Sequence, residues 1–185
     1  MYTTGSFTAV YPVTSMKEAG DTLRRFADYV GILDWLRTGL ALELTVKNTE
    51  FQAQARKLNV NITHSEAEQS YQNHAAERDI GELNKRYRQK MLRKKVPKRV
   101  WEYGFVHQAE VLSRISIGET GRTGIEEVIG NTPDISKWLY FDFYNRVWWL
   151  DKKKPSTTDE NIILGRWLGI SQKICCDMCY WVLTV

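Results

Sequence analysis

Apolar residues in the first third of the chain repeat with two different periods, one typical of strands and one typical of helices. The strand-like segments are rich in β-branched and aromatic side chains, and the segments between them space their apolar residues helically. This alternating order is typical of an α/β sheet. The predicted elements are a strand at 6–14, a helix at 15–30, a short buried strand at 33–38, a helix at 48–59 and a strand at 60–63.

Two long helices are predicted next, and Pro97 separates them because proline disfavours helical backbone at the residue before it. The first helix opens within the sequence QNHAAER, at residues 72–78, and the second runs over 97–117. Residues spaced three or four apart are expected to face the core. They are Ala76, Ile80, Leu83, Tyr87 and Met91 on the first helix, and Trp101, Phe105, Val106, Ala109 and Leu112 on the second.

The last third of the chain begins with a turn-rich loop and continues into aromatic, strand-like segments. We predict a short helical turn at 125–129 and strands at 141–150 and 179–185. The chain therefore divides into a predicted core at 1–116 and a β-rich appendage at 117–185. Five tryptophans are expected to pack in a small barrel or sheet rather than to stack on bases: Trp138, Trp148, Trp149, Trp167 and Trp181.

Charge along the chain is strongly local. The 185 residues carry a formal net charge of +4, and 26% of them are charged. Residues 85–99 contain nine lysines and arginines and no acid, so the rest of the chain is net negative. A merely solvated helix gains from mixed charges four positions apart. The segment therefore favours a polyanion partner such as DNA over a simple solvated face.

Cysteines and histidines give weaker signals. Cys175, Cys176 and Cys179 are odd in number and lack nearby histidines, so we expect thiols rather than a zinc site or a disulfide framework. This usage favours an intracellular location, nuclear or cytoplasmic, and no segment reaches the roughly 18 uncharged apolar residues of a membrane span. His64 and His74 flank the start of the first long helix and are candidates for DNA or metal contact, although structural roles are more ordinary for such residues.

Five stretches together resemble one family. They are FTAVYP from Phe7, LRTGLALEL from Leu36, QNHAAERDIGEL from Gln72, GRTGIEEVIGNTPDIS from Gly121 and LGRWLGIS from Leu164. These stretches resemble the integrases of copia-type retrotransposons, which are ribonuclease H-like polynucleotidyl transferases. The resemblance implies an incomplete ribonuclease H-like mixed sheet with flanking helices, followed by the β-rich appendage. It is strongest at QNHAAER, and Gly130, Thr132 and Pro133 with Asp134 match the family's signature after the core.

A site at the start of the first long helix follows from this resemblance. Glu77 corresponds to the third catalytic carboxylate of the family, which with two aspartates holds two Mg²⁺ ions for in-line displacement at phosphorus. Helical spacing places Gly81, Asn84, Arg88 and Lys95 on the same face as Glu77, as a track for a phosphate backbone. The predicted DNA-binding residues are Asn84, Lys85, Arg88, Lys94 and Lys95.

At the other two acids the chain departs from the family. Gly39 occupies the position of the second aspartate. Glu43 already has its own counterpart in the family pattern, so we do not expect it to substitute. The strand that bears the first aspartate corresponds to a segment upstream of Met1. Because one acid cannot hold two cations, we expect Mg²⁺ not to be bound productively and strand transfer to be absent.

The absent strand has a further expected consequence for folding. In the family this strand lies at the centre of the sheet, so the sheet here is expected to have a gap. Unpaired buried backbone groups cost about 1–3 kcal/mol each. A homo-oligomer or a complementing integrase chain is therefore an expected partner besides DNA. The main alternative is a non-catalytic DNA-binding protein derived from a transposable element, and a second is an active enzyme whose start was placed too late.

Overall fold

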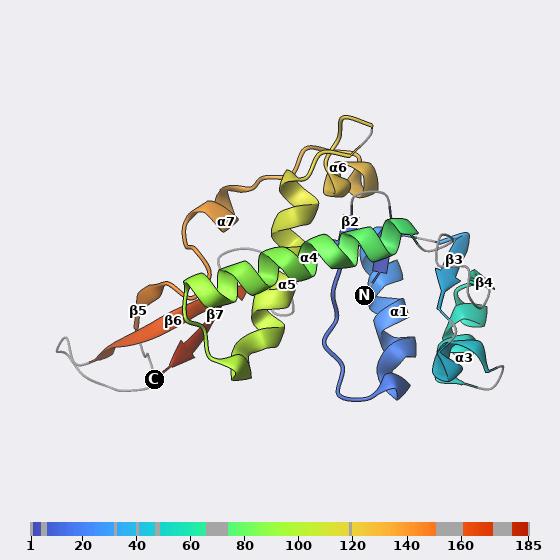
Figure 1. Cartoon of the computed structure of the whole chain (residues 1–185), viewed down its shortest axis with the longest axis horizontal. Helices are drawn as coiled ribbons and strands as arrows, with labels where there is room; N and C mark the ends of the chain where they lie inside the picture. The colour runs from blue at the N-terminus through green and yellow to red at the C-terminus, as the bar shows by residue number, and fades with distance from the viewer. Residues whose placement is uncertain are drawn as a thin grey trace.

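The computed structural model describes residues 2–4, 7–31, 33–39, 41–46, 49–65, 74–118, 120–150, 161–171 and 179–184, and it has a mixed α/β architecture. Figure 1 shows the elements in chain order. They are β1 (Tyr2–Thr4), β2 (Phe7–Ala9), α1 (Ala19–Val30), β3 (Trp35–Thr38), α2 (Leu42–Thr45), α3 (Glu50–Lys57), β4 (Asn61–His64), α4 (His74–Arg93), α5 (Trp101–Ile115), α6 (Gly124–Ile129), α7 (Ser136–Leu139), β5 (Arg146–Leu150), β6 (Ile162–Ile170) and β7 (Tyr180–Thr184), with 3-10 turns at Met16–Glu18 and Lys98–Val100.

The first half of the chain forms two separate two-stranded sheets. β1 and β2 pair antiparallel, and β3 pairs parallel with β4. The predicted strand at 33–38 is present, but the prediction that it is buried is wrong, because Trp35 is 68% exposed. The mixed α/β class is thereby confirmed, while the assignment to a ribonuclease H-like fold stays a prediction.

Helices α1 and α3 cover the apolar side of the β3–β4 pair. The Ser15 hydroxyl caps the turn before α1 by accepting a hydrogen bond from Lys17 N, and α1 ends at Gly31, whose φ of 100° favours glycine. Leu23 of α1 packs with Phe51 of α3 in a small buried cluster. The amphipathic pattern of the sequence is therefore sufficient to place these two helices.

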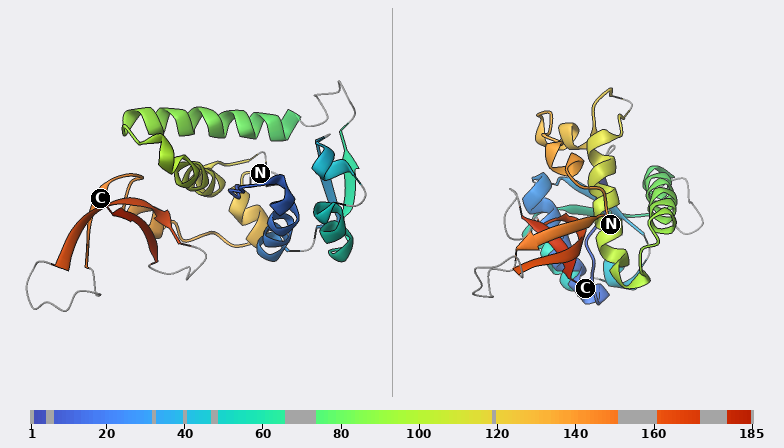
Figure 2. Two further views of the ribbon diagram at one scale, coloured as in Figure 1. Left: turned by 90° about the horizontal axis from the view of Figure 1, so that it is seen from below. Right: turned by 90° about the vertical axis from the view of Figure 1, so that its left-hand side faces the viewer.

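Helix α4 runs along one side of the molecule, from the region of β3 and β4 to the C-terminal sheet (Figures 1 and 2). It packs on α5 through Leu83, which is 1% exposed, and through Tyr87, whose ring lies 5.0 Å from that of Phe105. Two predicted core residues are not buried: Ile80 is 39% exposed and Trp101 is 54% exposed.

The C-terminal sheet is antiparallel with the strand order β5-β6-β7. The strand predicted at 141–150 begins only at Arg146, because Tyr144 has a φ of 64° and turns the chain. Trp167 is buried at 1% exposure, as the core prediction requires. Trp148 is 70% exposed, so that prediction is wrong for this residue. The polar loop at 151–160 lies outside the described residues.

Helix α6 packs against elements from the first half of the chain. Thr123 and Glu126 form a capping box at its start, and Gly130 closes it in the left-handed conformation. The Ile125 side chain is 1% exposed and packs with Phe7 and Phe26. The predicted division of the chain into 1–116 and 117–185 stays a prediction. Helix α6 belongs to the second part but packs against β2 and α1 of the first part.

Among the described residues, none of the helices combines the length and apolar character needed to cross a membrane.

Candidate nucleic-acid interface

Helix α4 carries the predicted acid at its first turn. Glu77 is exposed there, where a carboxylate also interacts favourably with the helix dipole. Asp79 is more enclosed, and burial raises the pKa of its carboxyl against the opposing charge of Arg78. Glu77 therefore faces solvent rather than a closed pocket.

Gly39 follows β3 where the carboxyl ends of β3 and β4 meet. The Thr38 hydroxyl lies 2.8 Å from His64 Nδ1, and Ser65 N donates to Thr38 O at 3.0 Å. A Cβ placed on Gly39 would meet no atom within 4 Å. The position predicted for the second acid is thus an open sheet end without a side chain, and His64 has a structural role there.

These residues do not fit a centre for two Mg²⁺ ions. Within the ranges that the structure describes, no three His, Cys, Asp or Glu side chains gather as ligands. Glu77 supplies one carboxylate and Gly39 supplies none. The side chain of Glu43, and Cys175 and Cys176 entirely, lie outside the described residues.

The cations of the basic segment at 85–99 fall into two groups, those in ion pairs with acids and those exposed to solvent. Arg86 binds Glu82 one turn earlier, with 2.5 Å between Arg86 Nε and Glu82 Oε1. Lys90 and Lys94 bind Asp142. Six cations are exposed and have no acidic partner in the described part of the chain: Lys85, Arg88, Arg93, Lys95, Lys98 and Arg99.

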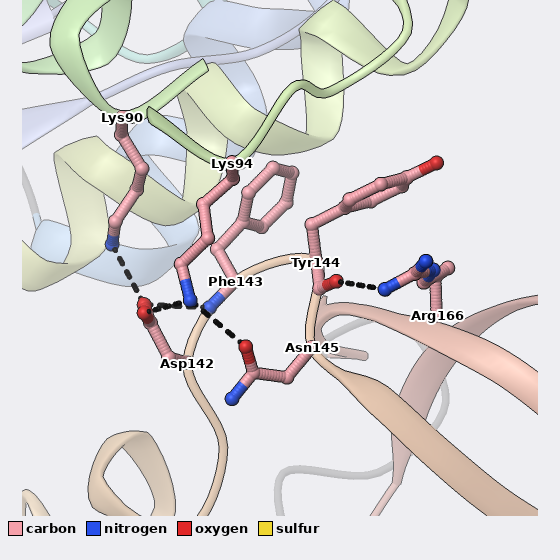
Figure 3. Close-up of polar contacts among 7 residues, drawn as sticks. All are labelled: Lys90, Lys94, Asp142, Phe143, Tyr144, Asn145 and Arg166. Carbon is pink, nitrogen blue, oxygen red and sulfur yellow. Dashed lines mark hydrogen bonds and ion pairs between the residues drawn. The ribbon is translucent and has the colours of Figure 1, made fainter. Parts of the chain in front are cut away.

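Figure 3 shows how Asp142 fastens the end of α4 to the chain before β5. Lys94 Nζ lies 2.6 Å from Asp142 Oδ2 and donates to Asn145 Oδ1 at 2.9 Å, whereas Lys90 Nζ is 3.5 Å from Asp142 Oδ1. Burial raises the pKa of Asp142, but the Lys94 hydrogen bond and the two ammonium charges outweigh it, so the pKa is lowered. Burial of Lys90 lowers its own pKa despite Asp142. Lys94 lies closer to Asp142 than Lys90 does.

Two predicted DNA-binding residues differ from the others in their surroundings. Lys94 is held by Asp142 and Asn145. Lys95 is exposed, but α4 ends at Arg93 and Lys95 has a φ of 50°, so it does not continue the helical face of Glu77 and Arg88. The sequence contained no local signal for these contacts, since Asp142 is 48 residues beyond Lys94.

The other predicted residues lie on α4 as expected. Lys85 and Arg88 are exposed, and Asn84 is half-buried. Figure 2 shows α4 at the periphery of the molecule in both views, with no other described element outside it. We call the exposed cations of α4 and of the α4–α5 turn the α4 basic surface: Lys85, Arg88, Arg93, Lys95, Lys98 and Arg99.

Helix α5 carries a buried histidine and, one turn further along, a half-buried glutamate. His107 is 4% exposed, its ring packs on Phe143 and Trp167, and neither ring nitrogen has a hydrogen-bond partner. Burial lowers the pKa of His107 to about 3, with a smaller contribution from Lys90. One turn along, burial raises the pKa of Glu110 to about 7 against the charge of Arg114 and a hydrogen bond from Trp138 Nε1. His107 is therefore neutral near pH 6.5.

No known protein family matches this chain, and no curated protein is similar to it.

Proposed function

We propose that the chain is an integrase-related protein that binds nucleic acid through the α4 basic surface and does not carry out strand transfer. The observation that carries the proposal is the division of the cations on and after α4. Three are in ion pairs with acids, and six are exposed on α4 and on the turn that follows it. The resemblance of QNHAAER to the integrase motif supports the same partner.

Electrostatics favours a phosphate backbone for this surface. The basic segment contributes far more positive charge than the whole chain retains. Each lysine or arginine that neutralises a phosphate releases a condensed counterion, which makes binding strongly salt-dependent. Binding of this kind needs no base recognition, and α4 offers mainly charge.

A salt titration of duplex DNA binding tests the binding part. We expect measurable affinity at low salt and a linear fall of log K with log salt concentration. The Arg88→Gln variant should reduce the slope by about 1. Arg25→Gln is the matched control, because Arg25 is exposed on α1. Absence of binding at low salt, or equal effects of the two variants, would contradict the proposal.

The non-catalytic part is tested separately with Mg²⁺ and a duplex substrate. We expect neither cleavage nor joining of the DNA, because Gly39 removes one acid and Glu77 is the only acid the motif supplies. The Glu77→Gln variant should bind DNA as well as the original chain. Cleavage that depends on Glu77 would overturn this part while leaving the binding proposal intact.

A further inference from the structure

The outer face of the β5–β6 pair is covered at one end and open at the other. Leu168 is buried against Val100 and Phe143. At the opposite end Trp148 is 70%, Leu150 57% and Ile162 46% exposed. Register places Leu150 opposite Ile162 and Trp148 opposite Leu164 on this face. A large aromatic ring therefore stands in solvent on a rigid strand.

Two arginines face each other next to this ring. Arg146 of β5 is directly opposite Arg166 of β6. Like charges directly opposite across an antiparallel pair are destabilising, and no acid lies in an ion pair with either arginine among the described residues. An anion between them would relieve this repulsion.

The Arg166 side chain is held in place by an unusual turn. Its Nη1 donates to Tyr144 O at 3.3 Å, and its guanidinium lies 4.9 Å from the centre of the Tyr144 ring (Figure 3). Tyr144 has a φ of 64°, which is uncommon for a bulky residue, and Tyr144 N donates to Trp167 O at 2.8 Å. Strained backbone of this kind concentrates at functional sites.

The arginine pair lies next to the residue that contacts the end of α4. Asn145 accepts from Lys94 at 2.9 Å and directly precedes Arg146 (Figure 3). The arginine pair is therefore adjacent to the C-terminal end of α4, where Asp142 is paired with both lysines.

We propose that the outer face of β5–β6 binds single-stranded nucleic acid, with a base stacked on Trp148 and backbone phosphates on Arg146 and Arg166. Stacking needs an unpaired base, so this face selects single strands, and charge beside an aromatic ring is the common chemistry of such sites. The inference deepens the proposed function and rests on it for the continuation of the strand along α4. A second copy is the less suitable occupant, because face-to-face pairing would bring four arginines together.

Binding of an oligothymidylate of about 15 nucleotides, within the range of known site sizes, tests the inference. Trp148→Ala should weaken this binding by at least about fivefold, the lower limit for loss of one stacked base. Trp148→Phe should retain most of it. Trp35→Ala is the matched control, since Trp35 is 68% exposed on another strand. Arg146→Gln should weaken binding and reduce the salt slope by about 0.7.

The outcomes separate this inference from the proposed function. If Trp148→Ala leaves oligothymidylate binding unchanged while Arg88→Gln weakens duplex binding, the sheet inference is wrong and the proposed function stands. If only Trp148→Ala has an effect, the sheet binds single strands and the role of α4 is wrong. If Trp148→Ala instead converts a dimer to a monomer in sedimentation without changing oligonucleotide affinity, the face is a self-association surface and the inference is overturned.

Discussion

At the scale of single residues, His107 links burial to acid stability. Its pKa is lowered to about 3, mainly by burial, from 6.5 in the unfolded chain. Between these values the unfolded state binds the proton and the folded state does not, so stability falls as pH falls from 6.5 to 3. We predict that His107→Phe removes this part of the acid sensitivity. Urea unfolding at several pH values measures it, and an unchanged acid limb in the variant would contradict the prediction.

Glu110 contributes a pH dependence of stability opposite in sign to that of His107. Burial raises its pKa to about 7 from 4.5, so the folded state holds a proton that the unfolded state loses between these values. Stability from this group is therefore fully present below pH 4.5 and is lost as pH rises to 7. We predict that Glu110→Gln abolishes the fall in the free energy of unfolding between pH 4.5 and pH 7. In the original chain the two groups offset each other between pH 4.5 and 6.5, so a plateau is expected there. A Glu110→Gln profile that still declines towards pH 7 would count against this assignment.

At the scale of elements, Asp142 joins the end of α4 to the chain before β5. We predict that Asp142→Asn increases duplex DNA affinity and steepens its salt dependence, because Lys90 and Lys94 are released. The same change should lower the free energy of unfolding by about 1 kcal/mol, as expected for a partly exposed hydrogen-bonded pair. Binding isotherms and urea unfolding measure the two effects. Asp134→Asn is a control, because Asp134 bonds Ser136 locally; equal DNA affinities for the two variants would refute the prediction.

The capping box of α6 gives a second prediction at this scale. Thr123 Oγ1 accepts from Glu126 N, and Glu126 Oε2 accepts from Thr123 N at 2.7 Å. Thr123→Ala should destabilise the protein by about 1 kcal/mol. Thr184→Ala, at an exposed residue of β7, serves as the control. Thermal unfolding measures both, and indistinguishable midpoints would show that α6 does not need its cap.

Sequence periodicity predicted where the helices lie better than it predicted which of their residues are buried. α1, α3, α4 and α5 occur where apolar spacing placed them, since amphipathic helices are local patterns. Burial of Trp101 and Trp148 was predicted wrongly, because which apolar residue faces a neighbour depends on packing between distant elements. β6 was not assigned its own boundaries from the sequence, because its mostly apolar residues, with two glycines and Arg166 among them, lack the regular alternation of a half-buried strand.

In the candidate site too, local features could be predicted from the sequence and contacts between distant segments could not. The exposed cations Lys85 and Arg88 follow from the charge run and helical spacing. The pairing of Lys94 with Asp142 does not, because it depends on where the chain before β5 returns to α4. The arginine pair on the sheet was missed for the same reason: Arg146 and Arg166 become opposite only through the register of β5 and β6. An alternation of Arg, Trp and Leu at 146, 148 and 150 was the one local signal of an open face.

At the scale of the whole molecule, the apolar interior is divided among several small clusters. One contains Leu23, Phe51 and Ala55 beside the β3–β4 pair, and another contains Val100, Phe143 and Leu168 beneath the C-terminal sheet. The strands likewise form three separate sheets in the described residues. Such an arrangement allows parts of a protein to open without the rest, because each cluster closes over its own elements.

We therefore predict two stability levels in native-state hydrogen exchange. Phe51→Ala should lower the protection of amides in α3 and β4 by about 3–5 kcal/mol, the usual cost for such a truncation, with a much smaller effect on β6. Phe143→Ala, at a residue with no exposed surface, should do the reverse. The two variants are matched in size change and burial, so each controls for the other. Equal loss of protection in both regions from either variant would mean that α4 and α5 couple the clusters into one cooperative unit, which would contradict the division proposed here.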